Sequence, residues 1–139
     1  MQTRRYGYTS FNDHRFTQGM NAWLGHDVYS TIRNPSATTV RTAVKESFVN
    51  GYPIAVDERE RYGGEHFNGH ANAAFGHITV VSGYNSKTDA VQFLDTSAGM
   101  WTNPTGAQNQ RFWYPSLQNF VTNHLVMTGG RDGTGLYTS

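Results

Sequence analysis

The stretch from Gly76 to Asp95, GHITVVSGYNSKTDAVQFLD, contains two apolar runs on either side of a polar turn. This pattern predicts an antiparallel hairpin with strands at 77–84 and 90–95 and a turn at 85–89. His77 opens the first strand and Asp95 ends the second, 18 positions later. Cross-strand neighbours on one face have Cβ atoms about 4.5–5.5 Å apart. We therefore expect this imidazole and this carboxylate to meet across the hairpin.

Three helices are predicted around the hairpin. The first runs over 12–24, capped by Asn12, and its apolar face includes Trp23. The second runs over 38–50, carries Phe48 on its apolar face and ends at a glycine suited to a left-handed cap. Pro115 can open the third helix, because proline is tolerated in the first turn. Its apolar residues are Leu117, Phe120 and Val121.

Shorter patterns predict the remaining strands and loops. Strands are expected at 27–33 and 53–57, with a possible edge strand at 125–127. Long loops are expected at 58–75 and 96–113, and loops of this length in compact domains are often functional. Helices mixed with an antiparallel hairpin indicate the α+β class, in a single domain over residues 1–139.

The composition excludes several classes of function. The formal net charge is +1 without basic or acidic runs, so nothing indicates nucleic acid or an anionic membrane as a partner. No segment approaches the roughly 18 apolar residues that span a bilayer, and the N-terminus lacks the apolar core of a signal peptide. The chain has no cysteine, which excludes disulfides, thiolate metal sites and a thiol nucleophile carried by these residues.

The expected contact between His77 and Asp95 has a functional and a structural interpretation. A carboxylate beside an imidazole fixes its tautomer and favours the imidazolium, so that the histidine can take a proton from a thiol or hydroxyl nucleophile. Alternatively, His77 only begins a strand and Asp95 only starts a turn, since short polar residues are common at strand ends. The spacing alone leaves both interpretations open.

Four short motifs between about residues 38 and 128 occur in an informative order: NGYPI at 50–54, GH at 76–77, GY at 83–84 and DT at 95–96. In this order and spacing the chain resembles the papain-fold cysteine peptidases of the bacteriocin-processing family and their secreted actinobacterial relatives. The resemblance implies a papain-like fold, an antiparallel half-barrel sheet with flanking helices. It also implies a peptide or protein substrate, and secretion of the complete protein.

The resemblance also implies roles for individual residues. His77 corresponds to the general base of the family, and Asp95 to the carboxylate that orients it. We expect His70, Gly76 and Trp101 to contribute to substrate binding. Neither a cofactor nor a metal ion is expected.

The chain departs from the family in one essential respect. Family members carry the nucleophilic cysteine at the start of an N-terminal helix, in a Trp-Cys-Gly-Pro-like motif with a glutamine just upstream, and this sequence contains neither motif. We therefore expect an incomplete domain that is inactive alone. We expect an upstream segment or a second chain, such as the partner in a dimer, to complete it.

Two other functions compete with this interpretation. The first is a non-catalytic peptide- or glycan-binding module that uses the region beside His77 and the aromatic loops. The second is a metal-dependent hydrolase with His66, His70 and His77 as ligands. The segment EHFNGH at 65–70 has two histidines four apart, but Gly69 argues against the helix on which such zinc ligands usually lie.

Overall fold

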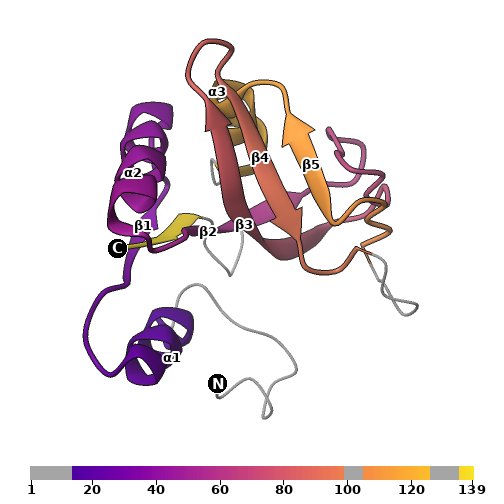
Figure 1. The fold of residues 1–139 in the computed structure, drawn as a ribbon. Helices are drawn as coiled ribbons and strands as arrows, with labels where there is room; N and C mark the ends of the chain where they lie inside the picture. Colours follow the sequence, from indigo (N-terminus) through magenta and orange to yellow (C-terminus); the bar gives the residue numbers. More distant parts are fainter. Residues whose placement is uncertain (1–13, 99–104, 126–134) are drawn as a thin grey trace.

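One antiparallel sheet organises the chain in the computed structural model, which describes residues 14–98, 105–125 and 135–139. Within these ranges the sheet has six strands in the order β1-β6-β2-β3-β4-β5. The strands are β1 (Ser30–Arg33), β2 (Ala55–Glu60), β3 (Phe75–Asn85), β4 (Ala90–Asp95), β5 (Arg111–Tyr114) and β6 (Gly135–Thr138). The helices are α1 (Arg15–Leu24), α2 (Ala37–Asn50) and α3 (Leu117–Phe120), which continues into the π-helical turn η2 (Val121–Leu125). The predicted α+β class is confirmed (Figure 1).

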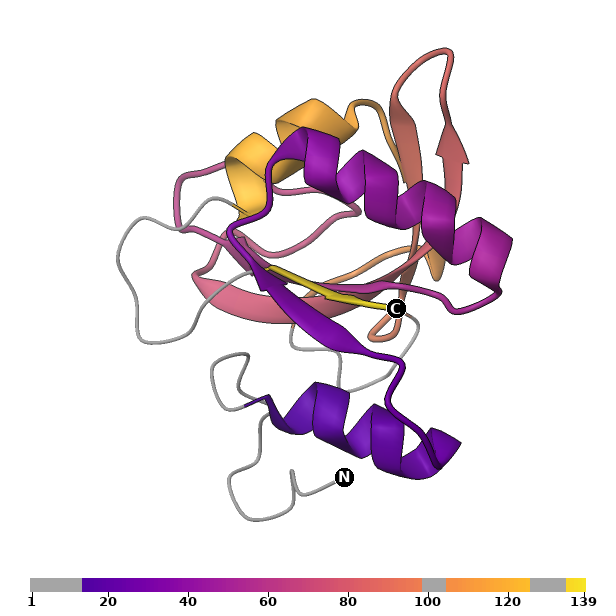
Figure 2. The ribbon, with the colours of Figure 1, turned by 90° about the vertical axis from the view of Figure 1, so that its left-hand side faces the viewer.

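Helices cover the two faces of the sheet unequally. In Figure 2, α2 and α3 lie on one side of the β1–β6 ribbon and α1 lies on the other. The main core lies beneath α2 and α3, where Val44, Phe93 and Phe120 are almost completely buried. On the opposite face, Phe16 of α1 stacks on Tyr137 of β6 with ring centroids 4.2 Å apart.

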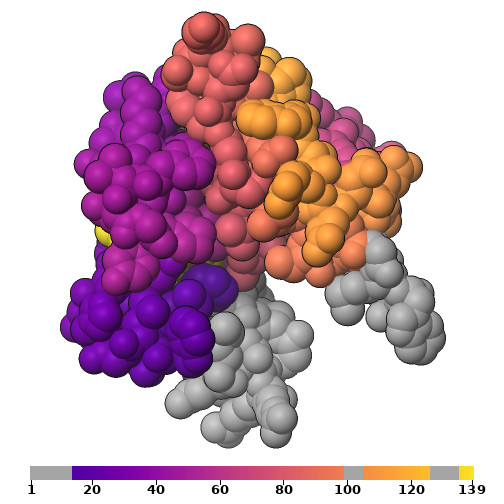
Figure 3. Space-filling model, in the orientation of Figure 1, coloured from indigo at the N-terminus to yellow at the C-terminus, as the bar shows by residue number. Residues whose placement is uncertain are grey.

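The predicted hairpin is present as β3 and β4. Thr79 is paired with Asp95, so His77, two residues before Thr79 in β3, lies on the same face as Asp95. An irregularity between Val81 and Gly83 shifts the register of the hairpin. The turn that joins the two strands projects at the top of the molecule (Figure 3).

The helix predictions need three corrections. α1 follows His14, whose φ is 57° and whose side chain makes no capping bond, whereas the predicted cap Asn12 lies outside the described residues. Trp23 is 82% exposed because Phe16, Met20 and Leu24, spaced four apart, form the face that packs on the sheet. Phe48 is 55% exposed, since the buried face of α2 continues from Val44 to Ser47 instead. The predicted left-handed glycine cap of α2 is confirmed, with φ 76° at Gly51.

Three extended segments also differ from prediction. β2 continues to Glu60, through residues that were expected to begin a loop. β5 and β6 were not predicted as strands, because each has only four residues. β5 pairs with β4, and β6 pairs with β1, which lies far away in the sequence. Leu125 belongs to η2 and not to an edge strand, and residues 126–127 lie outside the described ranges. No helix in the described part of the chain is long and apolar enough to cross a membrane.

Candidate functional site

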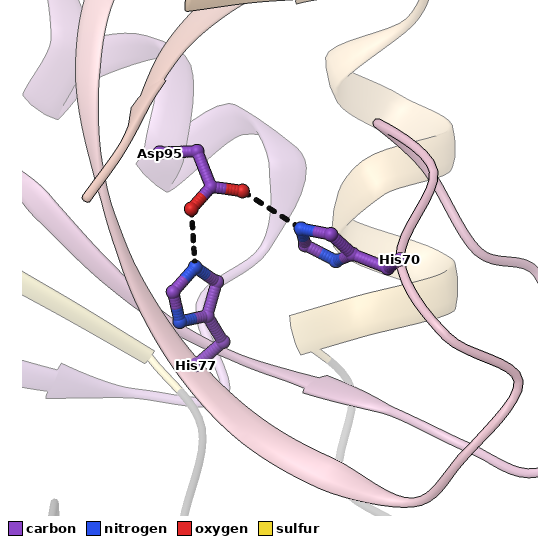
Figure 4. A group of neighbouring side chains, drawn as sticks. All are labelled: His70, His77 and Asp95. Atoms are coloured by element: carbon purple, nitrogen blue, oxygen red, sulfur yellow. Dashed lines mark hydrogen bonds and ion pairs between the residues drawn. The ribbon is translucent and has the colours of Figure 1, made fainter. Parts of the chain in front are cut away.

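Asp95 lies at the centre of a cluster of polar side chains on the core face of the sheet. Its side chain is completely buried. Oδ1 accepts hydrogen bonds from His77 Nε2 at 2.9 Å and from the backbone and hydroxyl of Ser97. Oδ2 accepts hydrogen bonds from His70 Nε2 at 2.7 Å and from the Asn68 amide at 3.1 Å. Figure 4 shows the carboxylate between the two imidazole rings.

These donors keep Asp95 ionised. Burial alone raises the pKa of the Asp95 carboxyl, but the hydrogen bonds from His70, His77 and Ser97 outweigh it and hold that pKa well below its usual range. An ionised carboxylate only accepts hydrogen bonds. The Nε2 atoms of His70 and His77 must therefore both carry protons.

The predicted contact between His77 and Asp95 is confirmed by the geometry of the hairpin. The side chain of His77 is 10% exposed, in contrast to the completely buried carboxylate. Its Nδ1 has no hydrogen-bond partner among the described residues, whereas Nε2 donates to Asp95. A neutral His77 thus has an available nitrogen lone pair that could accept a proton.

His70 joins two carboxylates that belong to strands on opposite sides of β3. Its Nδ1 bonds Glu60 Oε1 of β2 at 2.8 Å, and its Nε2 bonds Asp95 of β4. Burial lowers the pKa of His70, but the hydrogen bonds to Asp95 and Glu60 prevail and raise it to about 9, so the ring is a cation at neutral pH. The ring is completely buried, which speaks against the predicted substrate contact at His70.

The loop before β3 positions His70 through tight turns and contacts with a second loop. Asn68 has a positive φ of 51°, and Gly69 follows with φ 71°. A Cβ at Gly69 would lie 2.4 Å from the side chain of Gln108, so any other residue would have to displace that side chain and adopt a strained left-handed backbone. Asn68 O accepts from Gln108 N, and Ala71 N donates to Thr105 O. The loop is therefore fixed against residues 105–108.

Two glutamates of β2 extend the cluster and were not predicted as site residues. Glu58 and Glu60 are both completely buried. His66 Nδ1 lies 2.7 Å from Glu60 Oε2, although at an angle outside that of a hydrogen bond. Neither oxygen of Glu58 has a hydrogen-bond partner in the described chain, and His124 Nδ1 lies 3.8 Å away. Glu58 and Glu60 follow the apolar Val56 at two and four residues, and this alternation is the sequence signal that could have identified them.

Two sets of three side chains bring potential metal-ligating atoms within 4.8 Å of one another in the described residues. One comprises His70, His77 and Asp95, and the other comprises Glu58, Glu60 and His70. Neither set unites His66 with His70 and His77, the ligands considered from the sequence. His66 Nε2 instead bonds Asn72 Oδ1 at 3.1 Å.

Gly76 and Trp101 are the other two residues that were predicted to bind substrate. Gly76 is exposed on β3 beside His77, so its predicted role stays a prediction. Trp101 lies outside the described residues. Of the aromatic residues that flank it, Trp113 is 53% exposed but pairs with Gln92, on the sheet face opposite His77. Phe112 instead packs on Phe67, with ring centroids 5.2 Å apart.

Comparison of the chain with protein-family models, with curated proteins and with solved structures gives no match.

Proposed function

We propose that His77 and Asp95 are the general base and the orienting carboxylate of an acyl-transfer site of the papain-fold cysteine peptidase type. The observation that carries this proposal is the 2.9 Å hydrogen bond from His77 Nε2 to the buried Asp95 Oδ1. It leaves Nδ1 of a partly exposed ring available for proton transfer. His70 bonds the same carboxylate, but both of its ring nitrogens are occupied, so His77 is the histidine of the pair with a nitrogen available.

The proposed chemistry is hydrolysis of a peptide bond in two acyl-transfer steps. His77 Nδ1 takes the proton of a thiol, and the thiolate attacks the carbonyl carbon of the substrate. Asp95 holds the ring and stabilises the imidazolium, which then gives its proton to the leaving amine. His70 bonds Oδ2 of Asp95, whereas His77 bonds Oδ1, so the two histidines do not compete for the same oxygen.

The thiol must come from outside these residues, since the chain contains no cysteine. The proposal therefore includes a nucleophile on another segment or another chain, within a papain-like fold and a secreted protein. Alone, the described site can bind and move a proton but cannot form a covalent acyl intermediate.

The test uses the complete gene product and the rate at which iodoacetamide alkylates its cysteines. We expect one cysteine to react quickly at neutral pH, because a neighbouring imidazolium favours its thiolate. His77→Ala should slow that reaction and abolish peptide hydrolysis. His66→Ala is the matched control, since it removes a histidine that does not contact Asp95. Alkylation that is indifferent to His77 would sink the proposal, and so would the absence of cysteine from both the gene product and any chain that binds it.

A peptide- or glycan-binding module without catalysis is the second candidate, and the absence of cysteine favours it. The exposed edge of His77 would then belong to a binding surface. Binding of a peptide or glycan library that is lost in His77→Ala, without any hydrolysis by the complete gene product, would support this candidate.

A further inference from the structure

Three carboxyl groups are buried together beside the His77–Asp95 pair. Glu58, Glu60 and Asp95 are each fully buried, yet only Asp95 has a full set of hydrogen bonds. The ring of His70 is shared between Glu60 and Asp95. Glu58 accepts no hydrogen bond within the described residues. A buried carboxylate without such bonds strongly destabilises the fold unless it is protonated or binds a cation.

The unpartnered carboxylate of Glu58 lies among other potential ligands. Glu58, Glu60 and His70 each offer one ligating atom, and these atoms lie within 4.8 Å of one another. Two of the three residues are on one face of a single strand, which fixes their separation. For comparison, two ligands on a tetrahedral zinc ion with bonds of about 2.0–2.1 Å are about 3.3 Å apart. Only small side-chain movements are needed to surround an ion.

We propose that Glu58, Glu60 and His70 bind a divalent transition-metal ion, for which zinc is the natural probe. Carboxylate oxygen and imidazole nitrogen are both zinc ligands, and two carboxylates would neutralise the charge of the ion. His66 Nδ1, which has no hydrogen bond and lies 2.7 Å from Glu60 Oε2, is available as a fourth ligand.

The alternative set of His70, His77 and Asp95 fits an ion less well. An ion there would displace the histidine hydrogen bonds that Asp95 already accepts. At the proposed site the ion replaces only the contact between His70 Nδ1 and Glu60. His70 Nε2 would keep its proton and its hydrogen bond to Asp95. A carboxylate that orients a metal-bound imidazole in this way is a common arrangement around zinc.

The metal site is independent of the proposed acyl transfer, because it uses neither His77 nor a thiol. Its effect is to fix β2 against the loop that carries His66 and His70. Zinc binding and stability, and not peptide hydrolysis, are therefore the quantities to measure.

The experiment begins with the purified 139-residue protein, stripped with a chelator and titrated with zinc by calorimetry. We expect one zinc ion per chain and a higher melting temperature with zinc than with chelator. Cobalt in place of zinc should give the visible absorption of a tetrahedral site with nitrogen and oxygen ligands. If the wild-type protein does not bind one zinc ion, or if zinc leaves its melting temperature unchanged, the metal-site proposal is overturned. This result requires no variant, and it does not test the proposed acyl transfer.

Three variants then identify the ligands. Glu58→Gln keeps the side-chain volume and should weaken zinc binding by about tenfold or more. Asp57→Asn is the matched control, because Asp57 is the preceding residue of β2 and its carboxylate accepts from Tyr137 on the opposite face. His77→Ala should also retain zinc. If zinc binding is lost in His77→Ala but kept in Glu58→Gln, the ion belongs to the other set and this assignment is wrong.

Discussion

The two ends of β4 carry two aspartates in very different surroundings. Asp89, just before the strand, binds Arg41 of α2 through two contacts of 2.7 and 2.9 Å. It also accepts hydrogen bonds from Tyr84 and from the backbone of Gln118. Asp95, the last residue of the strand, is completely buried between two histidines.

The two clusters differ in how completely their buried or partly buried carboxylates are balanced by cations and hydrogen bonds. One carboxylate and one guanidinium balance each other at Asp89, where both side chains are about a third exposed. Near Asp95, two further carboxylates are buried, and Glu58 has no hydrogen-bond partner in the described chain. The balanced pair of Arg41 and Asp89 has a structural role, because it joins α2, the hairpin and α3. Buried polar atoms without partners are rare in native proteins and are often found at functional sites.

The largest expected effect follows from removing the buried carboxylate. Asp95→Ala leaves the cationic His70 with one carboxylate and leaves the backbone N–H of Ser97 without its acceptor. Breaking a buried ionic contact in this way costs about 3–5 kcal/mol. Urea denaturation measures the free energy of unfolding. A loss below about 1 kcal/mol would mean that the cluster does not stabilise the fold.

A smaller loss is expected at the other end of the strand. Asp89→Ala removes a partly exposed ion pair, which contributes about 0.2–1 kcal/mol, and the bond to the Gln118 backbone. We expect a total loss of about 1–2 kcal/mol in the same denaturation experiment. If this variant were destabilised as much as Asp95→Ala, burial would not distinguish the two clusters.

Acid should weaken the contribution of Asp89 to stability. The hydrogen bonds from Arg41 hold the pKa of Asp89 well below its usual range. A carboxyl group with a lowered pKa stabilises the fold above its unfolded pKa of about 3.9, and this contribution is lost as the pH falls through the folded pKa. The difference in unfolding free energy between wild type and Asp89→Asn should therefore shrink between about pH 5 and pH 2. A difference that stays constant over this range would contradict the role of the Arg41 pair.

The smallest effect on stability is expected at the proposed base. His77→Gln replaces one donor to Asp95, which keeps its bonds to His70, Ser97 and Asn68. A bond to an ionised carboxylate contributes about 1.5–3 kcal/mol, but the glutamine amide can donate in place of the imidazole, so the unfolding free energy should change by no more than about 1 kcal/mol. A much larger loss would assign His77 a mainly structural role. The same urea experiment compares it directly with Asp95→Ala.

The sequence was sufficient to predict the hairpin and the meeting of His77 with Asp95, because both depend on local alternation and a short turn. Glu58 and Glu60 were missed, since alternating charges after Val56 resemble a solvated loop. Their burial depends on the loop before β3 folding over β2, which local patterns do not reveal. β6 was missed for a similar reason, because it pairs with β1 at a separation of about 100 positions along the chain.

The position of His70 has a mechanical consequence. Its ring joins β2 to β4 over the intervening β3. β2 and β4 therefore cannot slide past each other without breaking its hydrogen bonds. Amide protons of the three strands should thus exchange with deuterium at similar rates near this point, as one cooperative unit. A single imidazole would set how often this part of the sheet opens.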